Sequence, residues 1–366
     1  MKIVLTGGGT GGHLIPLVTV AEKIKEKAPG VQFTFMGPKG KMEKEIMGAT
    51  GIKSRSIMSG KMRRYVSGYN IIDFIKLPIG FFQALFWLLV DMPDAVFSKG
   101  GYASMPVVLA AWVYRIPVMI HESDANPGMA NSMLSKFAER VAVSYPEAEK
   151  YFPASQVVFT GNPVRSDIAQ GDPQKARELF HLVESKKVIF VIGGSLGARN
   201  INNRILDILP ELLHKYQVIH QTGMDNFDEV KKKAGEMGIK AGREGYSPVD
   251  FYGAEIRDIL AVTDLVITRA GASNLSEIAA TKKAAIVIPL STSANDHQRM
   301  NAYSLAKNGS CLVLEEENLG SHMLLEKIEE LMNNEELRQK MAKNIGAFYR
   351  PDAADKIAEG VLGMIK

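Results

Sequence analysis

The sequence contains almost no cysteine and carries little net charge. Cys311 is the single cysteine among 366 residues, so neither an intramolecular disulfide nor a cysteine-based structural zinc cluster can form. This cysteine usage suits a reducing cytoplasm. The 44 basic and 40 acidic residues leave a net charge of +4. That balance argues against a nucleic-acid-binding protein but is compatible with an anionic membrane or a phosphorylated ligand.

Repeats, low-complexity tracts and a leader segment are also missing. No period of about 20 to 50 residues is visible, which argues against a solenoid, and glycine and proline are spread along the chain rather than gathered in a disordered tract. The chain begins Met1-Lys2-Ile3-Val4-Leu5 and then turns into glycines, so we expect no signal peptide.

Short apolar runs alternate with longer amphipathic stretches, and this rhythm occurs twice. Short continuous apolar runs are typical of buried parallel strands, so we predict an α/β fold with two doubly wound, Rossmann-like halves. The turn-forming Gly161-Asn162-Pro163 marks the boundary between domains at 1–163 and 164–344, followed by a helix at about 345–366. The expected strands are 3–5, 33–36, 95–97, 118–121 and 157–160, then 187–192, 217–221, 265–268, 285–289 and 311–314.

One stretch, FIKLPIGFFQALFWLLV at 74–90, is unusually apolar. Its continuous apolar part is too short to span a bilayer comfortably, so it is either a core helix or a helix lying at a membrane interface. Apolar side chains would surround most of the helix circumference, which favours the interface. The predicted membrane contacts are Phe81, Phe82, Phe86 and Trp87, with Lys61, Arg63, Arg64 and Lys76 near anionic headgroups.

Three glycine-containing turns follow predicted strands and precede predicted helices. They are GGGTGGH at 7–13, GGSLGA at 193–198 and RAGASN at 269–274. Any one of them is most simply a tight turn, but three at strand ends predict binding of phosphate groups. A nicotinamide dinucleotide would need an acidic residue near the end of the second strand, where the chain has Phe35-Met36-Gly37-Pro38. This argues against a dehydrogenase.

Several motifs along the chain together resemble the MurG family of glycosyltransferases. They are GGGTGGHLIP at the start, SKGGYASMPVVLAAW at 98–112, IPVMIHES at 116–123, GNPVR at 161–165, GGSLGARNIN at 193–202, RAGASNLSEIAA at 269–280 and DHQRMNA at 296–302. The resemblance implies a GT-B fold, in which two domains face each other across a cleft, with the final helix returning to the N-terminal domain. It implies inverting transfer of N-acetylglucosamine (GlcNAc) from UDP-GlcNAc to the MurNAc 4-hydroxyl of undecaprenyl-diphospho-MurNAc-pentapeptide (lipid I), which gives lipid II.

The resemblance also implies roles for individual residues in binding the donor. Glu277 would hold the ribose hydroxyls, Ser195 the diphosphate, and His297 with Gln298 the sugar hydroxyls. At Phe251-Tyr252 the backbone and an apolar side chain would edge the uracil. Neutral polar groups suit sugar hydroxyls, and helix N-termini suit a departing diphosphate. The remaining donor residues implied are Thr10, Gly11, Gly12, Arg165, Ala272, Ser273 and Asn274.

On the acceptor side the resemblance points to the first half. His13 is the preferred general base because an imidazole titrates near neutral pH, with Glu122 and Asp124 as alternatives. Asp124 stands where many relatives have asparagine, which makes it an additional acid/base candidate. The expected acceptor-binding residues are Gly9, Gly100, Gly101, Tyr102 and Ser104.

The resulting expectation is a peripheral enzyme at the cytoplasmic face of the bacterial cell membrane. Its partners would be UDP-GlcNAc, lipid I and the anionic membrane surface, with no nucleic acid. No cofactor or metal is expected, because helix N-termini and Arg165 can stabilise the UDP leaving group. Two alternatives remain open: a UDP-GlcNAc epimerase, and a non-catalytic membrane module that binds a UDP-sugar.

Overall fold

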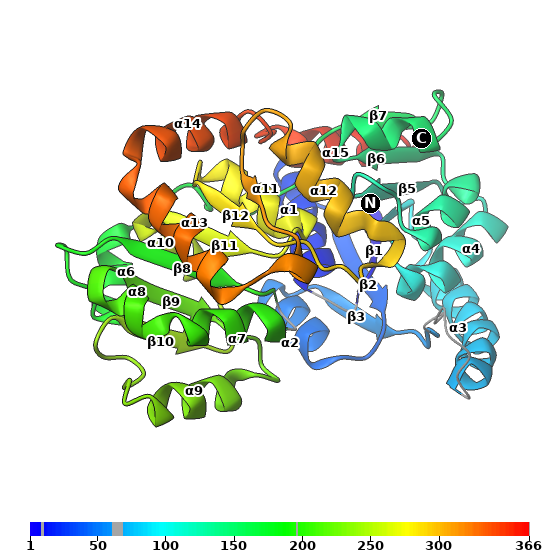
Figure 1. The fold of residues 1–366 in the computed structure, drawn as a ribbon. Coiled ribbons are helices and arrows are strands. Elements are labelled where there is room, and N and C mark those ends of the chain that lie inside the picture. The colour runs from blue at the N-terminus through cyan, green and yellow to red at the C-terminus, as the bar shows by residue number, and fades with distance from the viewer. Residues whose placement is uncertain (9–10, 61–68, 195–196, 366) are drawn as a thin grey trace. The chain divides into compact units, whose positions relative to one another are not determined.

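The computed structural model describes residues 1–8, 11–60, 69–194 and 197–365. Contacts divide the chain into two compact units (Figure 1). The first unit comprises Met1–Arg165 and Arg350–Lys366, and the second comprises Ser166–Tyr349. The sequence prediction had placed these divisions after residues 163 and 344.

The first unit is built on a seven-stranded sheet in which all neighbouring strands run parallel, in the order β3-β2-β1-β4-β5-β6-β7. The order reverses beside β1, and in such sheets ligands bind at the carboxyl ends of the strands near this reversal. The strands are β1 Lys2–Thr6, β2 Gln32–Gly37, β3 Lys53–Ser56, β4 Ala95–Ser98, β5 Val118–Glu122, β6 Arg140–Val143 and β7 Val157–Phe159.

Helices connect these strands and bury their apolar faces against the sheet. They are α1 Gly11–Lys27, α2 Lys41–Thr50, α3 Tyr69–Asp91, α4 Met105–Val113 and α5 Met129–Leu134, with short 3-10 turns at Tyr102–Ser104, Ser135–Phe137 and Pro146–Tyr151. Helix α15, Ala353–Leu362, joins the same core through Ile357 and Val361. On its other side Lys27 of α1 forms ion pairs with Asp355 and Glu359.

The second unit repeats the architecture with a six-stranded parallel sheet in the order β10-β9-β8-β11-β12-β13. Its strands are β8 Val188–Ile192, β9 Gln217–Gln221, β10 Tyr246–Val249, β11 Leu265–Thr268, β12 Ala285–Val287 and β13 Leu312–Val313. Its helices are α6 Pro173–Phe180, α7 Arg199–Asp207, α8 Leu209–Lys215, α9 Phe227–Glu236, α10 Ile256–Val262, α11 Ala272–Ala280, α12 His297–Ala306, α13 Ser321–Asn333 and α14 Glu335–Gly346, with 3-10 turns at Ala294–Asp296 and Glu316–Asn318.

The predicted α/β class with two Rossmann-like halves is confirmed, as are all ten predicted strands. Three strands were missed. Strands β3 (KSRS) and β10 (YSPV) lie at sheet edges and contain polar residues or proline, so neither has the apolar run of a buried strand. The third is β6 (RVAV), which lies between β5 and β7. The helix predicted at about 345–366 is wrong in its first part. Helix α14 ends at Gly346 and α15 begins at Ala353, because Pro351 disfavours helical geometry at the residue before it.

The packing of α15 gives a stability prediction. Ile357→Ala removes a fully buried side chain from the core of the first unit, so we expect the free energy of unfolding to fall by about 2 to 5 kcal/mol. Both tryptophans, Trp87 and Trp112, lie in this unit, so urea denaturation followed by tryptophan fluorescence reports on it specifically. The control Lys356→Ala removes only an exposed ion pair with Asp352 and should leave the free energy of unfolding close to that of the parent. Equal stability of Ile357→Ala and parent would contradict this packing.

Candidate active site

The first glycine turn connects the end of β1 to the start of α1, where it places His13. Nδ1 of His13 lies 2.9 Å from the carbonyl oxygen of Gly8. Because a carbonyl only accepts hydrogen bonds, Nδ1 carries the proton and Nε2 is left as a proton acceptor. Burial, and next the charge of Lys99, lowers the pKa of His13 below its ordinary value of 6.5. His13 is therefore a neutral imidazole with a basic Nε2 at neutral pH.

A second glycine turn, after β4, lies against His13. Gly100 and Gly101 have φ of 84° and 80°, and a Cβ atom on Gly101 would come within 3.1 Å of the His13 ring. The turn is held by Ser104, whose hydroxyl donates to the Gly101 carbonyl over 2.8 Å, and Tyr102 beside it is partly exposed. The structure thus brings together His13, Gly100, Gly101, Tyr102 and Ser104.

Glu122, at the end of β5, is hydrogen-bonded to the segment that follows it. Its two carboxylate oxygens accept hydrogen bonds from the backbone N–H of Asp124 (2.9 Å), the backbone N–H of Gly128 (3.1 Å) and the amide of Asn131 (2.9 Å). The residue is only 2% exposed, and burial is the main cause that raises its pKa to about 7. Glu122 therefore orders the loop. Asp124 is partly buried and its charge contributes to the shift.

Lys99 was not predicted from the sequence as a site residue. It directly precedes the glycine turn at Gly100-Gly101 and is 1% exposed. Its Nζ lies 2.6 Å from Nδ1 of His121 and 3.2 Å from Oδ1 of Asn162. The ammonium donates to Nδ1, so the His121 Nε2–H donates to the Gly161 carbonyl over 3.2 Å. Burial lowers the pKa of Lys99 to about 7. The sequence did contain a signal for this residue, a lysine placed between a predicted strand and a glycine turn.

The second unit places its two glycine-containing turns at the carboxyl ends of β8 and β11. In the turn after β8, Gly197 has φ of 75° and a Cβ atom there would lie 2.2 Å from the Thr222 carbonyl oxygen, so only glycine fits. Ser195 in this turn lies outside the described residues, as do Gly9 and Thr10 in the first one. Gly11 and Gly12 begin α1.

The turn after β11 leads into α11, where four predicted donor residues are found. Ala272, Ser273 and Asn274 form the first turn of the helix, and N–H groups at the start of a helix can donate hydrogen bonds to an anion. The amide of Asn274 donates to the Thr268 hydroxyl over 3.4 Å. Glu277 lies further along the same helix and is 7% exposed.

The pair His297-Gln298 begins α12 directly after a strained turn. Asn295 and Asp296 have φ of 53° and 55°, a left-handed conformation that asparagine and aspartate tolerate better than most other non-glycine residues. The His297 ring is hydrogen-bonded to the Ala294 carbonyl, and the side-chain oxygen of Gln298 accepts from the Leu290 N–H over 3.0 Å. Both side chains are partly exposed.

Tyr252 requires a correction. Its side chain is 5% exposed and packs edge-on against the rings of Phe180 and Phe190, so it is a core residue and its ring cannot contact a ligand. Only its backbone remains a candidate, whereas the neighbouring Phe251 is partly exposed. Arg165 ends the first of the two segments that make up the first unit, and it is also partly exposed.

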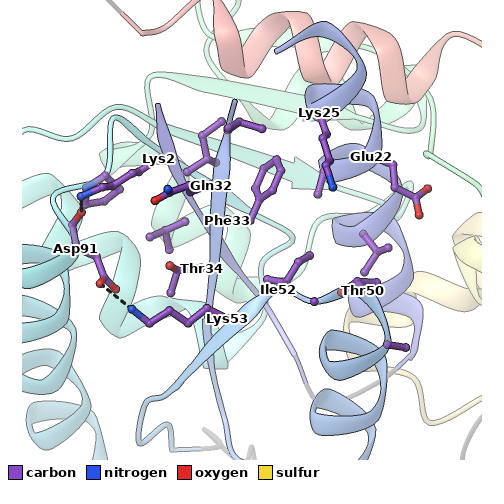
Figure 2. A pocket seen from close by; sticks show the side chains of 18 residues that line it. Lys2, Glu22, Lys25, Gln32, Phe33, Thr34, Thr50, Ile52, Lys53 and Asp91 are labelled. Atoms are coloured by element: carbon purple, nitrogen blue, oxygen red, sulfur yellow. Dashed lines mark hydrogen bonds and ion pairs between the residues drawn. The ribbon is translucent and has the colours of Figure 1, made fainter. Parts of the chain in front are cut away.

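A cavity of about 670 Å³ lies at the opposite, amino edge of the first sheet (Figure 2). Lys2 and Lys53 reach Asp91 there, through its backbone carbonyl (2.9 Å) and its carboxylate (3.6 Å). None of the predicted site residues lines this cavity, and both of these cations already have partners. We therefore place the chemistry at the glycine turns. Across the described ranges, no group of three or more His, Cys, Asp or Glu side chains could hold a metal ion.

Comparison with known proteins covers both units. The N-terminal and C-terminal domain models of glycosyltransferase family 28 match residues 3–143 and 188–357. A protein from Clostridium perfringens (strain SM101 / Type A) is 41% identical over 336 residues, which are 92% of this chain and 91% of the relative. It is named UDP-N-acetylglucosamine--N-acetylmuramyl-(pentapeptide) pyrophosphoryl-undecaprenol N-acetylglucosamine transferase.

Two solved structures agree in fold. Acinetobacter baumannii MurG has a TM-score of 0.73 at 25% identity over 99% of each chain. A putative UDP-N-acetylglucosamine 2-epimerase from Listeria monocytogenes has a TM-score of 0.72 over 98% of this chain and 95% of that one, but at 14% identity it shows a shared fold alone. The predicted GT-B class is confirmed. With family models matching both halves and a relative this similar over nearly its whole length, the chain belongs to glycosyltransferase family 28 and, within it, to the MurG family.

Proposed function

We propose that this chain transfers GlcNAc from UDP-GlcNAc to the MurNAc 4-hydroxyl of lipid I, forming lipid II in peptidoglycan synthesis. The observation that carries the proposal is the 41% identity to a transferase of that name over 92% of the chain. The ranges matched by the two family 28 domain models include the glycine turns of both units, whereas the likeness to the epimerase is one of fold.

In this proposal the second unit binds the donor. Backbone N–H groups at the start of α11 stabilise the UDP diphosphate as it leaves, a task that needs no cofactor. His297 and Gln298 supply neutral polar groups for the sugar hydroxyls, and Glu277 accepts the ribose hydroxyls. Ser195 and Arg165 complete the proposed diphosphate contacts.

The first unit binds the acceptor and takes up its proton. The glycine turn at Gly100-Gly101, with Tyr102, faces the lipid I diphosphate, and Nε2 of His13 accepts the proton of the 4-hydroxyl. The hydroxyl oxygen then bonds to the anomeric carbon from the face opposite UDP, and the bond from that carbon to the UDP oxygen breaks, which inverts the configuration. Glu122 is a weaker candidate for the base because both of its oxygens already accept hydrogen bonds.

Release of UDP from UDP-GlcNAc, with and without a lipid I analogue, tests the proposed function. A transferase releases UDP only when the acceptor is present. An epimerase forms the isomeric UDP-sugar without acceptor, and a non-catalytic binding module releases no UDP under either condition. Either of the last two outcomes would contradict the proposal.

The general base gives a prediction with a direction in pH. We expect His13→Ala to lower kcat by about 10² to 10⁴ while the UDP-GlcNAc dissociation constant stays near that of the parent. Because the pKa of His13 is lowered, its neutral form persists below pH 6.5, so activity should fall only at more acid pH. The pH dependence of kcat/KM, which reports the free enzyme, should show this acid limb in the parent and lose it in His13→Ala. Near-parental kcat in His13→Ala together with inactive Asp124→Asn or Glu122→Gln would make a carboxylate the base.

Helix α3 carries the proposed membrane contact, at the cytoplasmic face. Gly80, Ala84 and Leu88 form its buried stripe, while Phe82 and Phe86 are 67% and 57% exposed. Exposed Trp112 and Val113 at the end of α4, which packs beside α3, extend the apolar surface. Phe81 is partly buried, and Trp87 is partly buried beneath the Arg55 guanidinium, 3.8 Å from its ring centroid.

The charges proposed for this membrane contact are only partly described. Lys76 lies on α3, whereas Lys61, Arg63 and Arg64 fall outside the described residues. No helix in the described part of the chain is both long and apolar enough to cross a membrane. An apolar face combined with cations is the arrangement by which a helix lies at an anionic surface.

The double variant Phe82→Ser/Phe86→Ser tests this contact. It removes exposed apolar area without disturbing the buried stripe, so we expect weaker binding to vesicles containing phosphatidylglycerol and slower turnover of a long-chain lipid acceptor. Turnover of a short water-soluble acceptor should be unchanged. Val158→Ser, on an exposed valine of β7, is the matched control. Unchanged vesicle flotation of the double variant would remove α3 from the membrane contact.

A further inference from the structure

One carboxylate in the second unit binds side chains and backbone from three other segments. Glu316 begins the 3-10 turn Glu316–Asn318 and is separated from β13 by Leu314 and Glu315. Its side chain is 10% exposed. Its Oε1 accepts hydrogen bonds from the Arg269 guanidinium and from the Asn200 amide, the latter over 3.2 Å. Its Oε2 accepts from the N–H of Ser291 (3.2 Å) and from the Ser291 hydroxyl (3.3 Å).

Each of these three partners belongs to a different segment of the proposed donor site. Asn200 is the second residue of α7, immediately after the glycine turn at 193–198. Arg269 lies between β11 and the Ala270-Gly271 turn that begins α11. Ser291 follows β12 and precedes the strained turn that leads to His297. These segments leave the carboxyl ends of β8, β11 and β12, which are neighbours in the sheet with β13 beside them.

The network is charged and its hydrogen bonds are satisfied. Burial alone would raise the pKa of Glu316, but the bonds from Arg269, Ser291 and Asn200 outweigh burial and leave the pKa below its ordinary value. The other arm of the Arg269 guanidinium donates to the carbonyls of Ile288 and Pro289, over 3.3 and 3.4 Å. A buried ion pair of this kind is costly to break from one side, because the remaining charge then has no partner.

We propose that Glu316 is a positioning residue that holds the three donor-binding segments in one fixed arrangement without itself contacting the donor. The inference rests on the proposed function. Stabilising a leaving diphosphate requires N–H groups fixed before the reaction, and loops from three strands do not keep such an arrangement unless something joins them. The adjacent Glu315 binds a single segment, through Arg299 and Tyr303 of α12, and so does not join the three segments that meet at Glu316.

The experiment compares Glu316→Gln and Glu316→Asp with the parent and with Glu317→Gln. Glu317 lies in the same 3-10 turn but is exposed, which makes it the matched control. Glutamine keeps the size of the side chain but loses the charge and one acceptor oxygen. Aspartate keeps the charge paired but withdraws it by one methylene group, so it holds the fold if glutamine does not.

We expect both Glu316 variants to raise the KM and the calorimetric Kd for UDP-GlcNAc roughly tenfold, in line with the loss of charge-assisted hydrogen bonds. The KM for the lipid I analogue should stay within about twofold of the parent, since the acceptor binds the other unit in the proposal. Glu317→Gln should match the parent in every measurement. An equal rise in the KM for UDP-GlcNAc and in the KM for the lipid I analogue would indicate general destabilisation and overturn the inference.

Folded Glu316→Asp with a parental KM for UDP-GlcNAc would also overturn it. The same measurements distinguish failure of the proposed function from failure of the role proposed for Glu316. A parent protein that does not bind UDP-GlcNAc contradicts the proposed donor site itself, whereas a parent that binds it alongside unaffected variants contradicts only the role of Glu316.

Discussion

In both sheets, each pair of neighbouring strands that the structure describes runs parallel, and this direction determines where the turns and helix starts lie. Parallel strands must be connected by crossover helices, so all strand ends and all following helix N-termini within a unit gather at one edge of its sheet. The glycine turns occur there because the chain must turn tightly between strand and helix, and the N–H groups of the first helical turns point outward from the same edge. Each unit therefore offers one edge suited to anions.

An edge of this kind must also satisfy the polar groups that it buries, and the two units solve this in similar ways. In the first unit Glu122, at the end of β5, accepts three hydrogen bonds from the loop that follows. In the second unit Glu316, just after β13, joins Asn200, Arg269 and Ser291. In both carboxylates the oxygens accept hydrogen bonds that hold loops in place. In the proposed function it is other residues, such as His13 and Gln298, that contact the substrates.

Sequence patterns predicted what depends on local composition. Continuous apolar runs located ten strands, and glycines after those runs located the turns, because both features arise from neighbouring residues. The pattern could not locate β3 or β10, whose polar edge positions have no apolar signature. The burial of Tyr252 against Phe180 and Phe190 and the contact of Lys99 with His121 join residues far apart in the chain, so they emerge only from tertiary packing. The partial burial of Trp87 under Arg55 is of the same kind.

In the proposed reaction the acceptor hydroxyl attacks the anomeric carbon of the donor with inversion, while the first unit takes up the proton and the second holds the departing UDP. Nuclear magnetic resonance of the product formed from UDP-GlcNAc and a lipid I analogue tests it most directly. Because the donor sugar is α-linked to UDP, inversion should give a β-linked GlcNAc on the MurNAc 4-hydroxyl and an equal amount of free UDP. An α-linked product, or the 2-epimer of the UDP-sugar formed without acceptor, would contradict it.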